Sequence, residues 1–414
     1  MGDDLYRRLK RLKTVRAHPR ARPTGRSGSR VSSSPDDRPA AVPDSWRIVA
    51  PHVYEIRSEE SIPGWSRRWR ADAFHSHLTG REVRAADLSF IDCETTGLSG
   101  GAGTLVFLVG VGRVTAGRIE VVQYLLADFP GERDYLELVL DQIGRSTVWV
   151  SYNGKAFDAR LIETRCVMNA IAPPSPTHID LLYWARRLWR RILPDCSLST
   201  VESGVLGCPR DADIPGIEIP DRYFEYLKKR DAGALEPVVE HHRRDIASLA
   251  HLFVTVEEIL ATVAAPGSET DGPAIPAQRY DSYQLGRWLL AAGDPRGAGL
   301  LQSVFDRSSE SIGAEDRYAA AYLVARHHRR TGRPDLAEAV LADAWRAAES
   351  SAWCVHLVVE YAKLLEHDCR DPARALELVV AARRLTDRFT ASGDLERREQ
   401  RLRRAVTARE GRER

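Results

Sequence analysis

The chain has 414 residues, of which 43% are hydrophobic and 29% charged, enough for two or three folded domains of about 150 residues each. No run approaches the roughly 18 consecutive apolar residues of a membrane helix, and the charged amino terminus lacks the apolar segment of a secretory signal. These features argue against a membrane or secreted protein, and we expect a cytoplasmic chain with no membrane association.

The net charge of +2 is unevenly distributed. Residues 1–30 carry ten Lys/Arg against two Asp, and the last twenty residues are again rich in Arg. Basic segments bind phosphate backbones by releasing counterions, but solvated tails that aid solubility explain them equally well. Six cysteines are scattered without a C-x-x-C pair, which argues against a zinc site or disulfide framework and favours reduced thiols in the core.

The amino-terminal part of the chain carries little periodic pattern. We predict a disordered basic tail over residues 1–45, because 17–45 are rich in Pro, Ser, Gly and Arg. Residues 46–86 contain tryptophan and have mixed polarity, and we expect them to form an ordered lead-in segment to the next domain.

Residues 87–256 are predicted to form an α/β domain. Apolar runs over 87–94, 104–114 and 118–127 predict three strands, and a Gly-containing turn at 115–117 joins the last two as a hairpin. Alternating helices and strands follow, with helices over 131–144 and 155–168 and strands over 147–152 and 177–182. Three consecutive strands followed by alternating units predict a sheet of mixed direction flanked by helices.

The carboxyl-terminal part is predicted to be all-helical and repetitive. A Gly/Pro-containing linker over 257–278 precedes repeats over 279–390, and a charged tail follows over 391–414. Three prolines 39 and then 38 residues apart each open a helix, followed at fixed offsets by Ala and by Leu or Val: Pro295, Ala298, Leu301; Pro334, Ala337, Val340; Pro372, Ala375, Leu378. This spacing is typical of stacked helical hairpins, which loosely resemble tetratricopeptide repeats and offer a surface for a protein partner.

The first chemical motif is D-C-E-T-T-G, which follows the apolar run LSFI. Asp92 and Glu94 are two residues apart on a predicted strand and therefore point to the same face. Two carboxylates on one partly buried face repel each other unless a cation joins them, although an isolated D-x-E is common on solvated surfaces.

Two further motifs place acids on helices. In S-Y-N-G-K-A-F-D, a turn at Asn153 is followed by Asp158 in the first turn of a helix, where complementing the helix dipole is the simpler explanation. In H-H-R-R-D-I-A-S-L, on a helix predicted from about Leu235 to Phe253, Asp245 lies beside the apolar stripe and His241 one turn before it. A surface His–Asp pair is the alternative there.

Taken together, Asp92-x-Glu94, Asn153-x-x-x-Phe157-Asp158 and the late-helix Asp245 resemble the three motifs of the DEDD 3′–5′ exonuclease superfamily. The stretches THIDLLYWARRLW, SLSTVESGVLG, DADIPGIEIPDRYFEYL and EHHRRDIASL resemble more narrowly the YprB-like ribonuclease H-like proteins. The resemblance covers residues 87–256. It implies a ribonuclease H-like α/β fold, followed here by the all-α hairpin repeats.

The resemblance also implies an activity and a site. Asp92, Glu94, Asp158 and Asp245 would bind two divalent cations, Mg²⁺ or Mn²⁺, for phosphodiester hydrolysis of single-stranded DNA or RNA from a 3′ end. The remaining candidates are substrate-contacting residues and one supporting carboxylate: Thr95, Asn153, Lys155 and Asp180. A solvated helix start and a strand-end turn are ordinary explanations for Lys155 and Asp180.

One position departs from the superfamily pattern. The third motif usually has Tyr four residues or His five residues before the Asp, whereas this chain has His241 and Glu240 there. His241 could orient or deprotonate the attacking water, with His242 as the second choice. Two other functions stay open: a catalytically idle nucleic-acid-binding scaffold that recruits a protein through its repeats, and an endonuclease or junction resolvase on the same fold.

Overall fold

The computed structural model describes residues 42–62, 74–97, 103–115, 117–210, 213–264, 280–307, 313–348, 353–386 and 392–413. Residues 1–41 of the predicted tail and 265–278 of the predicted linker lie outside these ranges. The chain divides into two compact units, one comprising Met1–Trp184 and Ser197–Glu258 and the other Ala185–Cys196 and Ile259–Arg414.

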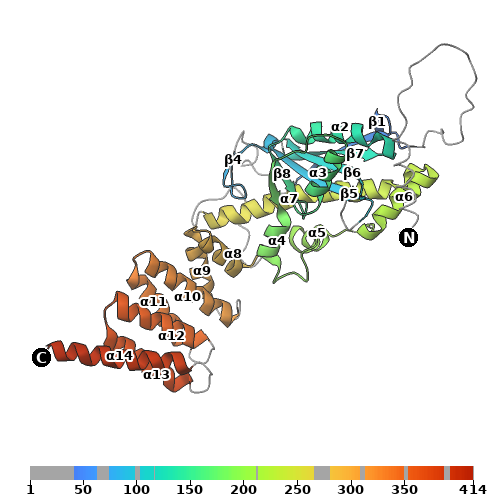
Figure 1. The fold of residues 1–414 in the computed structure, drawn as a ribbon. Helices are drawn as coiled ribbons and strands as arrows, with labels where there is room; N and C mark the ends of the chain where they lie inside the picture. The colour runs from blue at the N-terminus through green and yellow to red at the C-terminus, as the bar shows by residue number, and fades with distance from the viewer. Residues whose placement is uncertain are drawn as a thin grey trace, which may run out of the picture. The chain divides into compact units, whose positions relative to one another are not determined.

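A seven-stranded sheet forms the centre of the first unit (Figure 1). Its strands are, in chain order, β1 (Trp46–Ala50), β2 (Val53–Ser61), β5 (Leu88–Thr95), β6 (Val106–Thr115), β7 (Arg118–Leu126), β8 (Val148–Ser151) and β9 (Thr177–Asp180). Their spatial order is β1-β2-β7-β6-β5-β8-β9. Strands β5 to β7 are antiparallel, whereas β8 is parallel to β5 and β9 to β8, which confirms the predicted sheet of mixed direction.

Strands β1 and β2 extend the sheet beyond the segments that the sequence identified as strands. Strand β2 pairs with β7 from Val53↔Leu126 to Ser61↔Arg118, inside the region expected only to be an ordered lead-in. Charged residues hide this strand in the sequence: Glu55 is buried on it and binds Arg57 at 2.8 Å and Arg47 at 2.6 Å. A strand is recognised in a sequence by the alternation of apolar and polar residues, and charged residues that pair across strands interrupt that alternation. A separate two-stranded hairpin is formed by β3 (Phe74–Ser76) and β4 (Arg81–Val83).

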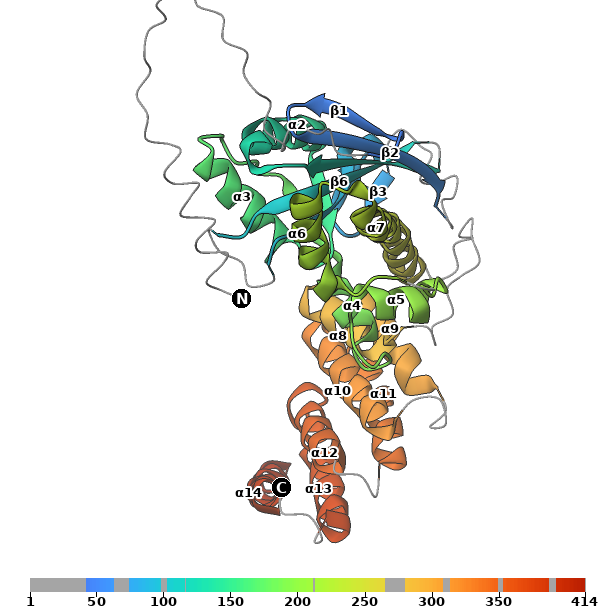
Figure 2. The same ribbon diagram turned by 90° about the vertical axis from the view of Figure 1, so that its right-hand side faces the viewer.

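Helices cover both faces of the sheet (Figure 2). The longer helices that lie wholly in this unit are α2 (Glu132–Gly144), α3 (Asp158–Met168) and α6 (Ile219–Lys229). Helices α4 (Leu181–Trp189) and α7 (Glu236–Ala264) begin in this unit and end in residues of the second. A short α5 (Leu198–Val201) continues into a π-helical turn, Glu202–Leu206. Phe107 of β6 stacks on Tyr223 of α6, with ring centroids 4.0 Å apart. The alternate residues Gly110 and Gly112 face Ile246 of α7, so α7 packs against the opposite face.

Helix α7 is longer than predicted, since it runs to Ala264 rather than ending near Phe253. Among the described residues, the segment Ala232–Val263 is long and apolar enough to cross a membrane by length and composition alone, with a mean hydropathy of 1.6 over its most apolar window. Of that window, 56% is buried inside the protein, and helices at the centre of a domain pass the same test, so this is weak evidence for a membrane span.

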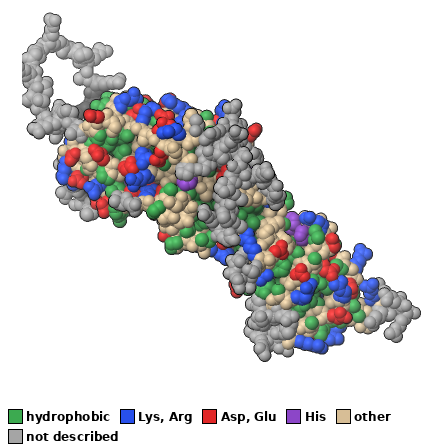
Figure 3. All heavy atoms as spheres, turned by 180° about the vertical axis from the view of Figure 1, so that it is seen from behind, with side chains coloured by type: hydrophobic (Ala, Val, Ile, Leu, Met, Phe, Trp, Pro, Cys, Tyr) green, Lys and Arg blue, Asp and Glu red, His purple; other side chains and the backbone are tan. Residues whose placement is uncertain are grey.

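The second unit is helical. Its helices are α8 (Ser282–Ala291), α9 (Arg296–Asp306), α10 (Ala314–Arg330), α11 (Pro334–Ala347), α12 (Trp353–Lys363), α13 (Pro372–Thr386) and α14 (Ser392–Glu413), the last within the predicted charged tail. The three prolines of the repeat stand at the starts of α9, α11 and α13, and the alanines that follow them are buried. These are the helical hairpins that the repeat predicted. On the face in Figure 3, acidic and basic side chains are interspersed.

The cysteines whose side chains the structure describes form no disulfide bonds. The five whose side chains are described, Cys93, Cys166, Cys196, Cys208 and Cys369, are all free thiols.

Candidate active site

Three separated segments bring four carboxylates together around the end of β5. Asp92 and Glu94 lie on β5, Asp158 is the first residue of α3, and Asp245 lies on α7. Asp92 is opposite Gly110 in the β5–β6 register. Because Gly110 has no side chain, α7 can approach the sheet there and place Asp245 near the β5 acids.

The charges of these acids act on one another. Burial raises the pKa of Asp92 well above its usual range, and the charges of Asp245, Asp158 and Glu94 raise it further. Burial and the same neighbours, Asp245 and Asp158, raise the pKa of Glu94. Burial also raises the pKa of Asp245, although the positive charges of His241 and Arg210 oppose this shift.

Asp158 is the most buried of the four, with 8% of its surface exposed. Burial, followed by the charge of Asp180, raises its pKa to about 7. Several carboxylates that oppose each other's ionisation are stabilised when a cation neutralises them. Their oxygen donors fit a hard divalent cation such as Mg²⁺ or Mn²⁺, so the residues present suit the metal that the sequence predicts.

The turn before α3 is held by Asp180 at the end of β9. One carboxylate oxygen of Asp180 accepts hydrogen bonds from the amides of Asn153 (2.8 Å) and Leu182 (3.1 Å), and the other accepts one from the amide of Lys155 (3.2 Å). Asn153 has a φ of 63° and Gly154 lies against Asp158, where a Cβ would be 2.7 Å from an Asp158 oxygen. Asp180 therefore fixes the loop that presents Asp158.

The expected substrate-contacting residues differ in exposure. Thr95 is buried, and its hydroxyl donates to the carbonyl of Gly97 at 2.9 Å, which shapes the turn after β5. Asn153 and Lys155 are exposed beside Asp158. Lys155 also lines an open pocket of about 490 Å³ together with Arg160 and His178.

His241 lies inside a network of charged side chains. Its Nδ1 is 2.8 and 2.9 Å from the two carboxylate oxygens of Asp213, and its Nε2 is 3.5 Å from an Asp245 oxygen. The Arg210 guanidinium binds the other Asp245 oxygen, Asp213 at 2.7 Å and the buried Glu202 at 2.5 and 2.6 Å.

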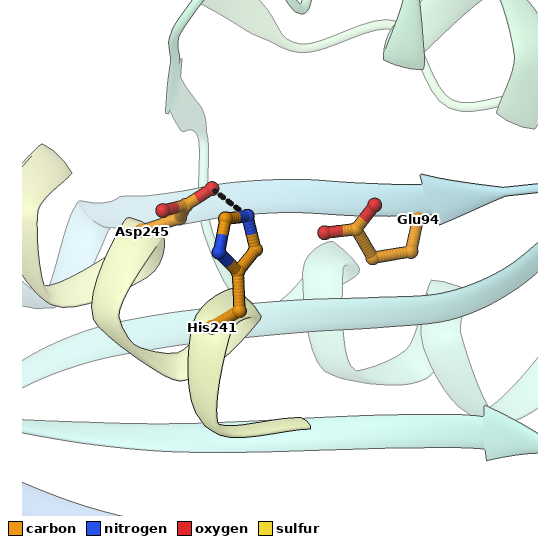
Figure 4. A group of neighbouring side chains, drawn as sticks. All are labelled: Glu94, His241 and Asp245. Atoms are coloured by element: carbon orange, nitrogen blue, oxygen red, sulfur yellow. Dashed lines mark ion pairs between the residues drawn. The ribbon is translucent and has the colours of Figure 1, made fainter. Parts of the chain in front are cut away.

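Glu94, His241 and Asp245 each offer a ligand atom, and these atoms lie within 4.8 Å of one another (Figure 4). In Figure 4 the imidazole lies between the two carboxylates, which come from β5 and α7. The structure thus adds a nitrogen donor, His241, to the carboxylate oxygens of the acids.

His242, the second choice for a base, has a different environment. It is fully buried, its Nδ1 accepts from the Gln123 side-chain amide at 2.9 Å, and its Nε2 lies 3.0 Å from the Asp92 carbonyl oxygen. Burial lowers its pKa to about 3. A neutral imidazole with both nitrogens engaged by the protein supports the packing of α7 on β5 and has no free nitrogen for substrate.

Sequence reasoning missed the residues that surround His241. Glu202 and Asp213 lie in stretches that were singled out only for their resemblance, Arg210 lies between those two stretches, and no local pattern marks the roles of the three residues. Charged residues are no more frequent in this part of the sequence than in the whole chain, so the sequence offered no signal for them.

The chain is similar to several known proteins. Residues 89–257 match the RNase H superfamily. The chain is 31% identical over 361 residues to the uncharacterized protein YprB of Bacillus subtilis (strain 168), a match that covers 84% of this chain and 83% of that protein. Among solved structures, a family B DNA polymerase from the hyperthermophilic archaeon Pyrobaculum calidifontis is similar with a TM-score of 0.34 and 16% identity, over 49% of this chain and 28% of the polymerase.

Proposed function

The chain belongs to the family of YprB and carries an RNase H superfamily domain, and from this membership we propose that it is a metal-dependent nuclease. In this proposal it hydrolyses phosphodiester bonds of single-stranded DNA or RNA in the cytoplasm, acting as an exonuclease from the 3′ end. The observation that carries the proposal is the convergence of Asp92, Glu94, Asp158 and Asp245: ligand atoms of Glu94 and Asp245 lie within 4.8 Å of each other, and the charges of Asp158 and Asp245 raise the pKa of both Asp92 and Glu94.

The acids would hold two divalent cations, Mg²⁺ or Mn²⁺. When bound, such ions lower the pKa of a water and stabilise the charge that develops on the phosphate. The β5–β6 pairing holds the backbone of Asp92 opposite Gly110 and that of Glu94 opposite Leu108. Asp158 depends on the loop that Asp180 fixes, and Asp245 depends on the packing of α7.

The substrate would approach on the exposed side of Asp158. Asn153 and Lys155 are exposed there, and the Lys155 ammonium can pair with a phosphate of the strand. The helical hairpins of the second unit are the candidate surface for a protein partner.

The scaffold alternative is supported by one observation. Arg210 binds an oxygen of Asp245 and so supplies positive charge next to the acids. A resident guanidinium could stabilise the cluster in a protein that binds nucleic acid without cleaving it.

The test is degradation of end-labelled strands by the full-length protein. With Mg²⁺ or Mn²⁺, 5′-labelled single strands should shorten progressively from the 3′ end, while circular single strands resist. Asp92→Ala should reduce the rate by about 10³-fold or more, since it removes a ligand of the reacting centre. Asp141→Ala, at a position whose side chain is 68% exposed, is the matched control and should cleave normally.

Three other results would change the conclusion. Cleavage of circular strands would make the protein an endonuclease. Unchanged substrate with both metals, on single-stranded and duplex DNA and RNA, would refute the nuclease. Tight strand binding in that case would favour the scaffold.

A further inference from the structure

We propose that His241 Nε2 is itself a metal ligand, completing with Glu94 and Asp245 a mixed nitrogen and oxygen site that prefers a first-row transition metal ion such as Mn²⁺ over Mg²⁺ (Figure 4). This inference rests on the proposed function only in that both need a cation at these acids. It replaces the expectation that His241 acts as the base.

The first step is to establish which ring nitrogen of His241 carries a hydrogen. Both oxygens of Asp213 lie within hydrogen-bonding distance of Nδ1, at 2.8 and 2.9 Å, and a carboxylate can only accept. Nδ1 therefore carries a hydrogen and donates it to Asp213. The Arg210 nitrogen at 3.3 Å from Nδ1 is more distant and is also a donor, so it cannot compete for that role. In the neutral ring, Nε2 then carries a lone pair.

The second step concerns the atoms that lie near His241 Nε2. The nearest carboxylate oxygen is Asp245 Oδ2 at 3.5 Å, which is too far for a good hydrogen bond. Arg210 binds the opposite oxygen, Oδ1, and so holds the Asp245 carboxylate with Oδ2 turned toward the imidazole. A cation between Nε2 and Oδ2 would take the place of any proton on Nε2 and bind both atoms.

Glu94 supplies the third donor. Its ligand oxygen lies within 4.8 Å of those of His241 and Asp245, which is close enough for one ion to be shared. No described side chain forms an ion pair or hydrogen bond with the Glu94 carboxylate, so coordination would cost it no existing partner.

Asp158 gives an independent indication that a cation belongs here. Asp158 has 8% of its surface exposed, and within the described chain the hydrogen bond that lowers the pKa of its carboxyl group comes from its own backbone amide. Its charge acts on both Asp92 and Glu94, so it faces the same cluster. A buried carboxylate with no cationic side chain of its own is neutralised either by a proton or by a cation from outside the chain, and a divalent cation at this cluster would serve Asp158 as well as Asp92 and Glu94.

The identity of the cation follows from the nitrogen donor. Mg²⁺ takes oxygen ligands almost exclusively, whereas imidazole suits first-row transition ions. A metal-binding histidine commonly donates its other ring N–H to a carboxylate, which fixes the tautomer and increases ligand basicity. Asp213 occupies that position, so it is the positioning residue of this site.

The experiment uses Mn²⁺ as the probe and the full-length protein. Electron spin-echo envelope modulation should detect ¹⁴N coupling to bound Mn²⁺, and calorimetry should show Mn²⁺ binding at least about 10-fold more tightly than Mg²⁺. His241→Gln should abolish the ¹⁴N coupling, while His251→Gln, the same change on the same helix, should retain it. Asp213→Asn should keep the coupling but lower Mn²⁺ affinity by about 10-fold, because an amide orients the ring less strongly.

The outcomes separate the two proposals. Mn²⁺ binding without ¹⁴N coupling, or equal affinity for Mg²⁺, would overturn the mixed site and leave the nuclease intact. A ¹⁴N signal that disappears in His241→Gln supports the mixed site even if no strand is cleaved. An absence of Mn²⁺ binding would overturn the inference outright.

Discussion

The Nε2 of His242 lies 3.0 Å from the backbone carbonyl oxygen of Asp92 and ties the centre of α7 to the strand that carries the first two acids. The same imidazole accepts from Gln123 on β7, so one buried residue joins a helix and two strands. His241, its neighbour in sequence, points into the acidic cluster instead. Adjacent histidines on one helix therefore serve different purposes, one in packing and one in the site.

His242→Ala should destabilise the first unit by about 2–4 kcal/mol. The change leaves a cavity and removes the hydrogen bond to the buried Asp92 carbonyl. Urea unfolding followed by circular dichroism measures the loss. His356→Ala, at an exposed position on α12, should change the unfolding free energy by no more than about 0.5 kcal/mol. Equal stability of the two variants would contradict the role assigned to His242.

Gly110→Ala should displace α7 from the sheet. A Cβ at this position would lie 2.1 Å from Ile246 Cδ1 and 2.7 Å from His242 Cε1, so the helix must shift or the side chains must leave their rotamers. Overpacking of this kind costs about 1–3 kcal/mol. Because α7 carries His241 and Asp245, Mn²⁺ affinity should fall as well.

The matched control is Gly144→Ala at the end of α2, where a Cβ would meet nothing within 4 Å. This variant should retain both stability and Mn²⁺ affinity. A Gly110→Ala protein that binds Mn²⁺ normally would show that α7 tolerates the displacement.

Asp158→Asn should stabilise the metal-free protein at neutral pH. The folded pKa of about 7 lies above the unfolded value of 3.8, so the favourable contribution of Asp158 is fully present below about pH 3.8 and is lost as the pH rises through about 7. Between pH 4 and pH 8, the unfolding free energy of the variant should therefore rise relative to that of the natural protein, by roughly 1–3 kcal/mol at pH 8.

With Mn²⁺ bound, the natural protein should be more stable than Asp158→Asn. Metal binding adds to the unfolding free energy, and the variant loses part of that contribution. Thermal unfolding across the pH range, with chelator and with Mn²⁺, measures both effects. A variant that is less stable than the natural protein in chelator at pH 8 would contradict the raised pKa.

Asp180→Ala should release the loop that presents Asp158. Three backbone amides lose their acceptor, including that of Asn153 in its left-handed conformation, and we expect a loss of about 1–3 kcal/mol. Mn²⁺ affinity should fall by about 10- to 100-fold, as when a supporting group of a metal ligand is removed. Asp180→Asn keeps one acceptor oxygen and should lose less stability and less Mn²⁺ affinity than Asp180→Ala. An unchanged Mn²⁺ affinity in Asp180→Ala would contradict the role of Asp180 in positioning Asp158.

The sequence determined the local elements and their chemistry. Apolar runs marked β5, β6 and β7, and the two-residue spacing of Asp92 and Glu94 put both on one face of β5. The three prolines marked the starts of α9, α11 and α13. These features depend on backbone periodicity and on residues a few positions apart, and such short-range constraints can be read directly from the chain.

Only the tertiary structure decided how His241 is held. Its partner Asp213 is 28 residues away, Arg210 reaches Asp245 across 35 residues, and His242 reaches Asp92 across 150. These contacts depend on how a charged connecting segment folds back onto α7, and on how closely α7 approaches glycines of β6. No local pattern encodes that approach, because the free energy of each contact exists only after the distant segments have packed together.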